Sequence, residues 1–176
     1  MILFINGSFG VGKSTVAELL VRRIPNSMLY DPEEVGICLS HIVRPIERFE
    51  DFQDLPMWRT LTITTAQLLK QSYGRTLVMP MTVWYEPYFH EIIHGLRQFE
   101  PDLLHVCLTA PAETIFARLE GRRHEHTAEN YRWISQRIER CVQVFQSPTF
   151  AVQVATDDCT PEEIVNSIVT LLPAPA

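Results

Sequence analysis

The sequence contains no apolar run that approaches the length of a membrane-spanning helix. We also expect no leader segment, because the first predicted strand already begins at residue 2. Hydrophobic residues make up 46% and charged residues 20% of the 176 positions, a balance typical of a protein that builds a buried core. We therefore expect a cytoplasmic protein folded as one domain over residues 1–176, with surface contact to a membrane left open.

Cysteine is scarce and scattered. The chain has four cysteines with no C-x-x-C pair among them, at Cys38, Cys107, Cys141 and Cys159. This pattern argues against a disulfide framework and favours small core residues in a reducing compartment. His124 and His126 have no further metal ligands near them in the sequence, so exposed loop histidines are the better interpretation.

The chain also has no excess of positive charge. The net charge is −6, with 21 acidic and 15 basic residues, which makes the chain a poor candidate for gripping nucleic acid through its phosphates. We expect a small-molecule substrate and no nucleic-acid partner. The arginines are nevertheless unevenly spread, and six of them crowd one short region: Arg118, Arg122, Arg123, Arg132, Arg137 and Arg140. Their planar side chains favour bidentate contacts to phosphate.

One stretch stands out against this background, the sequence GSFGVGKST at residues 7–15. It fits the P-loop pattern G-x-x-x-x-G-K-[ST], and it lies between an apolar segment and a helical pattern, as that motif requires. The predicted nucleotide-binding residues are Gly7, Ser8, Phe9, Gly10, Val11, Gly12, Lys13, Ser14 and Thr15. Lys13 is expected to reach the β- and γ-phosphates, and the Ser14 hydroxyl to ligate Mg²⁺.

Five short apolar segments alternate with helical patterns along the chain. They cover residues 2–5, 27–30, 76–79, 103–108 and 150–154. This alternation predicts an α/β fold, with a five-stranded parallel sheet, helices on both faces and right-handed crossovers. Among the helices, a weakly patterned one that Pro45 interrupts is expected over residues 33–50, and a long one over residues 131–145. Ligands of such folds bind at the carboxyl ends of the strands.

Asp31 is expected at this ligand-binding edge, because it follows the second predicted strand. A carboxylate there could accept the proton of an attacking hydroxyl or help to hold Mg²⁺ through water. Asp followed by Pro also commonly begins a turn, so a purely structural role for Asp31 stays open.

The arginine-rich region predicts a helical lid over residues 118–140. Its central segment, residues 121–130, is polar and is predicted to be a mobile connection between two helices. A lid that closes over a transferring phosphoryl group would place arginines such as Arg118, Arg122 and Arg140 against the charge that develops there. The alternative is a solvated helix face whose arginines pair with the glutamates of the same run.

A substrate pocket is expected beside Asp31. Met81 and Thr82 follow the third predicted strand, and Trp58 and Arg59 belong to the helix that precedes it. Aromatic and cationic side chains there could line a pocket for a ring and an anionic or sugar group. Core packing for Trp58 and a plain surface position for Arg59 are the competing interpretations.

Beyond the P-loop, several blocks of the sequence resemble the tunicamycin-resistance proteins, which belong with the small P-loop kinases. The blocks that carry the resemblance are Tyr30-Asp31-Pro32-Glu33, Asp51-Phe52-Gln53, Pro56-x-Trp58-Arg59, Pro80-Met81-Thr82 and Tyr88-Phe89-x-Glu91-Ile92-Ile93. The resemblance continues through Leu96-Arg97-Gln98, Arg118-Leu119, Trp133, Ile138 and Arg140-Cys141. It covers nearly the whole chain and implies a nucleoside-monophosphate-kinase-like fold that binds ATP.

The resemblance also implies roles for individual residues. Arg118 matches the position whose side chain stacks on adenine, and the turn near Thr156 and Asp157 would pass the adenine edge. Asp31 occupies the place of the catalytic base. Residues 80–82 contain no acid where many P-loop proteins carry the Walker B aspartate, so Ser14 is the one metal ligand that the sequence assigns.

These expectations lead to a functional hypothesis with two alternatives. The chain is predicted to be an ATP- and Mg²⁺-dependent phosphotransferase acting on a hydroxyl of tunicamycin or a related nucleoside compound. Alternatively, it sequesters the antibiotic with ATP tuning the affinity, or it is a nucleotide or sugar kinase.

Overall fold

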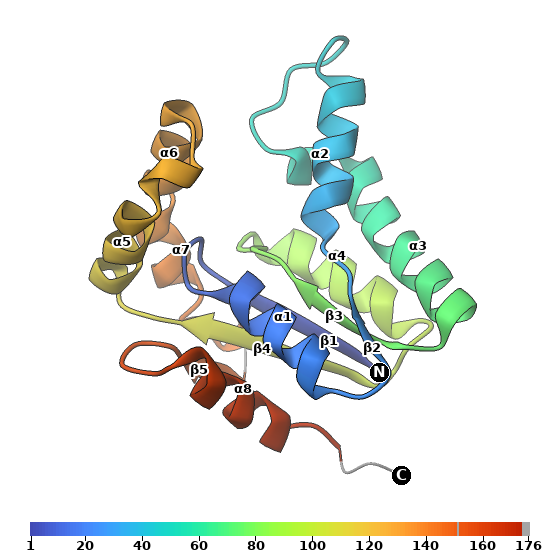
Figure 1. Ribbon diagram of the computed structural model, residues 1–176. Helices are drawn as coiled ribbons and strands as arrows, with labels where there is room; N and C mark the ends of the chain where they lie inside the picture. The colour runs from blue at the N-terminus through green and yellow to red at the C-terminus, as the bar shows by residue number, and fades with distance from the viewer. Residues whose placement is uncertain (151, 174–176) are drawn as a thin grey trace.

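A five-stranded parallel sheet forms the centre of the computed structural model, which describes residues 1–150 and 152–173 (Figure 1). The strands are β1 (Ile2–Gly7), β2 (Ser27–Leu29), β3 (Thr76–Pro80), β4 (Leu103–Thr109) and β5 (Gln153–Ala155). Their order across the sheet is β2-β3-β1-β4-β5, and every neighbouring pair is parallel. The predicted α/β fold is therefore confirmed. β1 lies in the middle, so the P-loop that follows it emerges at the centre of the carboxyl edge.

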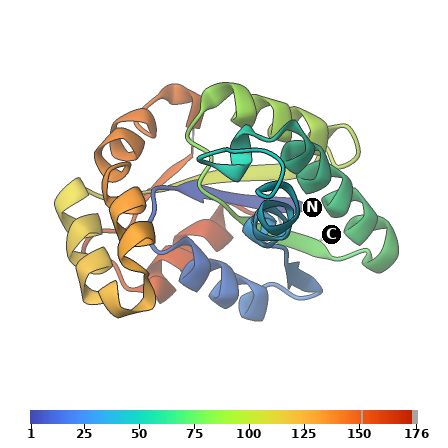
Figure 2. The same ribbon diagram turned by 90° about the horizontal axis from the view of Figure 1, so that it is seen from above.

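Helices cover both faces of this sheet (Figure 2). One face packs against α1 (Lys13–Arg23), α5 (Ala112–Gly121) and α8 (Pro161–Thr170), and the other against α3 (Pro56–Tyr73) and α4 (Glu86–Arg97). The remaining helices are α2 (Pro32–Val43), α6 (Ala128–Ser135) and α7 (Ile138–Val144). In Figure 1, α2 and α6 rise on opposite sides of the carboxyl edge of the sheet.

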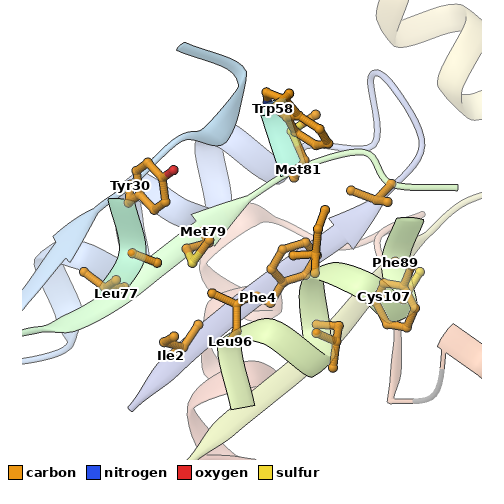
Figure 3. Close-up of a cluster of buried hydrophobic side chains, with 14 of the residues drawn as sticks. Ile2, Phe4, Tyr30, Trp58, Leu77, Met79, Met81, Phe89, Leu96 and Cys107 are labelled. Carbon is orange, nitrogen blue, oxygen red and sulfur yellow. The ribbon is translucent and has the colours of Figure 1, made fainter. Parts of the chain in front are cut away.

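The two cores follow from the alternation of side chains along β1. Leu3 and Ile5 point into the core beneath α1, α5 and α8, whereas Ile2 and Phe4 point into the core on the α3 and α4 side. Figure 3 shows the second cluster, in which Phe4 packs with residues of β3 and α4. Since β1 is buried on both faces, the sheet centre and the loop that it carries are firmly held.

Two predicted helices have different boundaries in the structure. The helix expected over residues 33–50 ends at Val43, because Pro45 cannot continue it. The helix expected over residues 131–145 is interrupted between α6 and α7, where the N–H of Arg137 donates to the carbonyl of Ile134 in a tighter turn.

The connection expected over residues 121–130 is partly helical. It contains a 3-10 helix, Arg123–Glu125, and the start of α6. The hydroxyl of Thr127 accepts a hydrogen bond from the N–H of Asn130 at 3.1 Å and caps α6. A threonine at this position is a local sign of a helix start, and it was not used in the sequence-based prediction.

The fifth strand is shorter than expected and begins at Gln153, since Phe150 belongs to a 3-10 helix, Pro148–Phe150, and residue 151 lies outside the described residues. Among residues 1–150 and 152–173, no helix combines the length and the apolar character that crossing a membrane would need.

Candidate functional site

The loop from β1 to α1 has the backbone shape of a phosphate cradle. Gly7, Gly10 and Gly12 all have positive φ angles, of 141°, 73° and 106°. Gly7 also passes so close to β4 that a Cβ atom there would lie 2.5 Å from the carbonyl oxygen of Leu108. Gly12 precedes α1 in the left-handed conformation and contributes no side chain to cap it. The first N–H groups of α1 are therefore left for a ligand.

Polar groups inside this loop also fit an anion. The Lys13 ammonium donates to the carbonyl oxygen of Ser8 at 2.8 Å, which folds the side chain back over the loop. Ser8 is 2% exposed, and its hydroxyl, which lies beside the Cys141 thiol, has no hydrogen-bond partner in the described part of the chain. Ser14 is exposed at the start of α1. These groups suit a triphosphate, with Ser14 positioned as a ligand for its Mg²⁺.

Asn6 holds the cradle in place. Its amide oxygen accepts hydrogen bonds from the N–H groups of Gly7 and Val83, both at 2.9 Å, and its amide nitrogen donates to the carbonyl of Val83 at 3.0 Å. The side chain is fully buried and joins the end of β1 to the segment after β3. The P-loop and the segment around Met81 and Thr82 are therefore fixed relative to each other.

We expect Asn6→Ala to lower the free energy of unfolding by about 2–4 kcal/mol, because it leaves three buried backbone groups without partners. Urea unfolding checks this. Asn166→Ala, on the exposed face of α8, is the matched control and should change stability little. Equal stability of the two variants would contradict the structural role of Asn6.

The electrostatic environment of Lys13 is unusual for a lysine. Burial lowers the pKa of its ammonium group from 10.5 to about 8, opposed mainly by the carboxylate of Glu33. Removing a charged ammonium from water is costly unless an anion compensates it. A bound phosphate supplies that anion, so nucleotide binding should raise the pKa of Lys13.

This depressed pKa gives the ligand-free protein a measurable dependence on pH. A lysine whose pKa is lower in the folded than in the unfolded chain opposes folding while both states are protonated. The penalty is full below about pH 8 and disappears as the pH rises toward 10.5, so the stability of the folded state increases across that window.

We therefore expect the difference in unfolding free energy between wild type and Lys13→Met to shift in favour of wild type between about pH 7 and about pH 10. Urea titrations of both proteins at the two pH values measure it, and common contributions from other groups cancel. A constant difference would show that Lys13 has an ordinary pKa.

Two carboxylates stand at the start of α2, opposite the cradle. Asp31 caps this helix, since its Oδ1 accepts a hydrogen bond from the N–H of Glu33 at 2.9 Å. Burial raises the pKa of both side chains, and the attraction of Lys13 partly offsets this. The structural role foreseen for Asp31 is thus real, although its second oxygen remains free of that cap. Glu33 lines a large cavity and was not singled out from the sequence.

That cavity, of about 710 Å³, lies between the P-loop, the start of α2 and the lid. Its wall includes Phe9 of the P-loop, Glu33, Asp51, Gln53, Met81, Thr82, Trp133 and Arg137. The volume falls within the range of about 300–1,000 Å³ that is common for small-molecule sites. The cavity thus brings Phe9 of the P-loop together with polar, aromatic and charged side chains.

Five residues are predicted from the sequence to contact the substrate, and Asp31 is not among those that line the cavity. The other four divide into two pairs. Met81 and Thr82 line the cavity. Trp58 is fully buried and donates from its indole to the carbonyl of Pro32 at 3.0 Å, so it supports the wall from behind instead of touching a ligand. Arg59 is also buried and is already paired with Glu91 and the carbonyl of Gln53. Both residues are therefore corrected from substrate contacts to structural supports.

The lid arginines occupy three different environments. Arg118 donates to the Thr156 hydroxyl at 3.0 Å, the Thr156 carbonyl at 2.6 Å and the carbonyl of Val11 at 3.2 Å. It thus connects the P-loop with the turn after β5. Arg122 is exposed where α5 ends, and Arg140 stacks on Trp84 at 4.6 Å. Asp157 lines a neighbouring hollow with Ser8.

Arg137 lines the large cavity. The sequence places it in the arginine-rich region, but it is not among the three arginines to which a catalytic role was assigned. It stacks on Trp133 at 4.0 Å, donates to the Trp133 carbonyl at 3.1 Å and lies 3.5 Å from a carboxylate oxygen of Glu50. Gln53 is equally fixed, because its side-chain amide donates to the carbonyl of Thr82 at 2.8 Å. No group of three or more potential metal-ligating side chains occurs in the described part of the chain.

Comparison with solved structures confirms the resemblance predicted from the sequence, as a likeness of fold. The chain matches the tunicamycin resistance protein of Deinococcus radiodurans with a TM-score of 0.79 and 22% identity, covering 99% of both chains. It matches a gluconokinase from Sinorhizobium meliloti with a TM-score of 0.65 and 16% identity, over 96% of this chain and 89% of that one.

A shikimate kinase from Acinetobacter baumannii shares the fold as well, with a TM-score of 0.61 and 13% identity over 97% and 91% of the two chains. A search of curated protein sequences finds no match. The comparison with protein families matches residues 2–161, nearly the whole chain, and shows that the protein belongs to the AAA domain family.

Proposed function

We propose that this protein transfers the γ-phosphoryl group of ATP to a hydroxyl group of tunicamycin or a related nucleoside compound. One observation carries the proposal: the 710 Å³ cavity reaches the P-loop at Phe9 and holds the carboxylate of Glu33 in the same wall. An acceptor in this cavity would lie between the phosphates and a potential base. The likeness to the D. radiodurans tunicamycin resistance protein supports the choice of acceptor.

The nucleotide would bind along the carboxyl edge of the sheet. When bound, ATP with Mg²⁺ supplies the phosphoryl group and a metal ion that neutralises part of its charge. Lys13, the Ser8 hydroxyl and the N–H groups at the start of α1 would hold the β- and γ-phosphates, and Ser14 the metal. Arg118 would stack on the adenine beside Thr156.

We assign the proton-accepting role to Glu33 in preference to Asp31. The Glu33 carboxylate belongs to the cavity wall, whereas Asp31 does not line the cavity. Desolvation raises the pKa of both carboxylates, so the position of Glu33 in the wall is what favours it as the base. Asp31 would keep α2, and with it Glu33, in position through its cap. Arg137, which also lines the cavity, would stabilise negative charge that develops on the transferring group.

A second candidate function is sequestration of the antibiotic without chemistry. The segment after β3 supports it, because Met81 and Thr82 line the cavity where a Walker B carboxylate would otherwise hold Mg²⁺. In that case ATP would modulate the affinity for the drug and would not be consumed.

Acceptor-dependent formation of ADP tests the proposal. Purified protein with ATP and Mg²⁺ should release ADP faster when tunicamycin is added, whereas gluconate and shikimate should have no such effect. Stimulation by gluconate or shikimate alone would indicate a sugar or metabolite kinase. Saturable binding of tunicamycin without ADP release would support sequestration.

A further inference from the structure

A second cavity, of about 350 Å³, adjoins the large one at the edge of the lid. The two cavities share four wall residues, Glu50, Asp51, Gln53 and Arg137, so a ligand could extend from one into the other. The second cavity adds residues from the 3-10 helix Phe52–Asp54, the β3–α4 loop, α4 and α7: Asp54, Trp84, Tyr85, Tyr88 and Arg140. The function proposed above uses none of these added residues for binding.

Three aromatic rings form one side of this cavity. Tyr85 meets Trp84 at a centroid distance of 6.4 Å and Tyr88 at 4.7 Å, with interplanar angles of 70° and 77°. Arg140 covers Trp84 at 4.6 Å, and Arg59 covers Tyr88 at 4.1 Å. Tyr85 is 46% exposed, so part of this aromatic residue is open to a ligand.

Charges of both signs surround the rings. Glu50, Asp51 and Asp54 supply carboxylates, and Arg137 and Arg140 supply guanidinium groups. Two of the carboxylates are oriented by the protein itself, since Asp51 accepts from the N–H of Gln53 at 2.9 Å and Asp54 from the Tyr88 hydroxyl at 3.1 Å. Both carboxylates accept these hydrogen bonds through Oδ1, so the Oδ2 atom of Asp51 and that of Asp54 are left to accept from a ligand hydroxyl.

This combination selects among ligand types. An anion would meet three carboxylates, a cation would meet two guanidinium groups, and an apolar chain would leave the free carboxylate oxygens of Asp51 and Asp54 without a hydrogen-bond donor. A neutral ring with several hydroxyl groups satisfies every element, because its C–H face stacks on the aromatic rings while its hydroxyls donate to carboxylates and accept from guanidinium groups.

We propose that this second cavity, bounded by Tyr85, Asp54 and Arg140, binds a neutral polyhydroxylated ring of the sugar type. The proposal rests on the function proposed above in one respect: the ring would be a distal part of the acceptor whose reacting hydroxyl lies in the large cavity. The cavity would thereby favour acceptors that carry a sugar ring beyond the group that is phosphorylated.

Binding of simple sugars tests this without any need for catalysis. The probes are methyl β-glucoside as the neutral ring, glucuronate as its anionic counterpart, glucosamine as its cationic counterpart and cyclohexanol as the apolar one. Saturation-transfer NMR on the full chain gives the dissociation constant of each. We expect methyl β-glucoside to bind more tightly than the other three.

Two substitutions locate the site. Tyr85→Ala removes the exposed ring and should weaken binding of the glucoside about tenfold. Asp54→Asn keeps the shape of the side chain, so it gives a second test that does not depend on how the protein tolerates Tyr85→Ala. Tyr73→Ala, an exposed tyrosine in α3, is the matched control and should leave binding unchanged.

The outcomes separate this proposal from the proposed function. Absence of glucoside binding, unchanged binding in both cavity variants, or tighter binding of any comparator would overturn the sugar site, even if tunicamycin is phosphorylated. Conversely, glucoside binding that is lost in Tyr85→Ala but retained in Lys13→Met would support the sugar site, even if no acceptor is phosphorylated.

Discussion

Replacing Lys13 by methionine is expected to reduce phosphoryl transfer by about 10²- to 10³-fold or more, because it removes the positive charge that the cradle directs at the transferring group. The ammonium lies over the loop at 2.8 Å from the Ser8 carbonyl, so a methionine of similar length keeps the packing and loses only the charge and the hydrogen bond. Steady-state ADP release with tunicamycin as acceptor measures the effect.

The chain supplies its own control, because Lys70 is the one other lysine in the sequence. Lys70 lies in α3 and pairs with Glu100 at 2.8 Å, so its position is explained by that ion pair. Lys70→Met should leave the rate of transfer unchanged. A Lys13→Met protein that is folded and transfers phosphate at the wild-type rate would remove the P-loop lysine from the mechanism.

Glu33→Gln is the second substitution with a large expected effect. It should lower kcat about 10²- to 10⁴-fold, the range over which a positioned general base contributes, while the affinity for ATP changes little. The amide keeps the size of the side chain but cannot accept the proton of the acceptor hydroxyl. Single-turnover measurements with saturating ATP separate this loss of chemistry from any loss of binding.

Asp31→Asn is the matched variant, since asparagine caps a helix about as well as aspartate and should preserve the start of α2. We expect it to reduce kcat by less than about tenfold, in contrast to the loss expected for a general base. The reverse pattern, a severe defect in Asp31→Asn and a mild one in Glu33→Gln, would return the base role to Asp31, where the sequence first placed it.

Much of the fold could be predicted because its signals are local. The P-loop pattern, the apolar strands and the capping residues each occupy a few consecutive positions, and parallel strands bring their carboxyl ends to one edge of the sheet. Gly7 and Gly12 have the positive φ angles that the motif requires. The helix break near Arg137 was missed because its cause is a turn with no proline or glycine to mark it.

The walls of the site could be predicted less well, because distant segments meet there. Asn6 and Val83 are 77 positions apart and are joined by two hydrogen bonds, and no sequence pattern around either residue predicts this contact. Gln53 reaches Thr82 in the same way. Trp58 was predicted to contact the substrate because the sequence does not distinguish an aromatic residue that lines a cavity from one that packs behind its wall.

Mass analysis of tunicamycin after incubation with the protein, ATP and Mg²⁺ tests the central claim most directly. The account predicts a product heavier by one phosphoryl group, formed by the wild-type protein and not by Lys13→Met. Tunicamycin that binds to the wild-type protein and is recovered with its mass unchanged would contradict it.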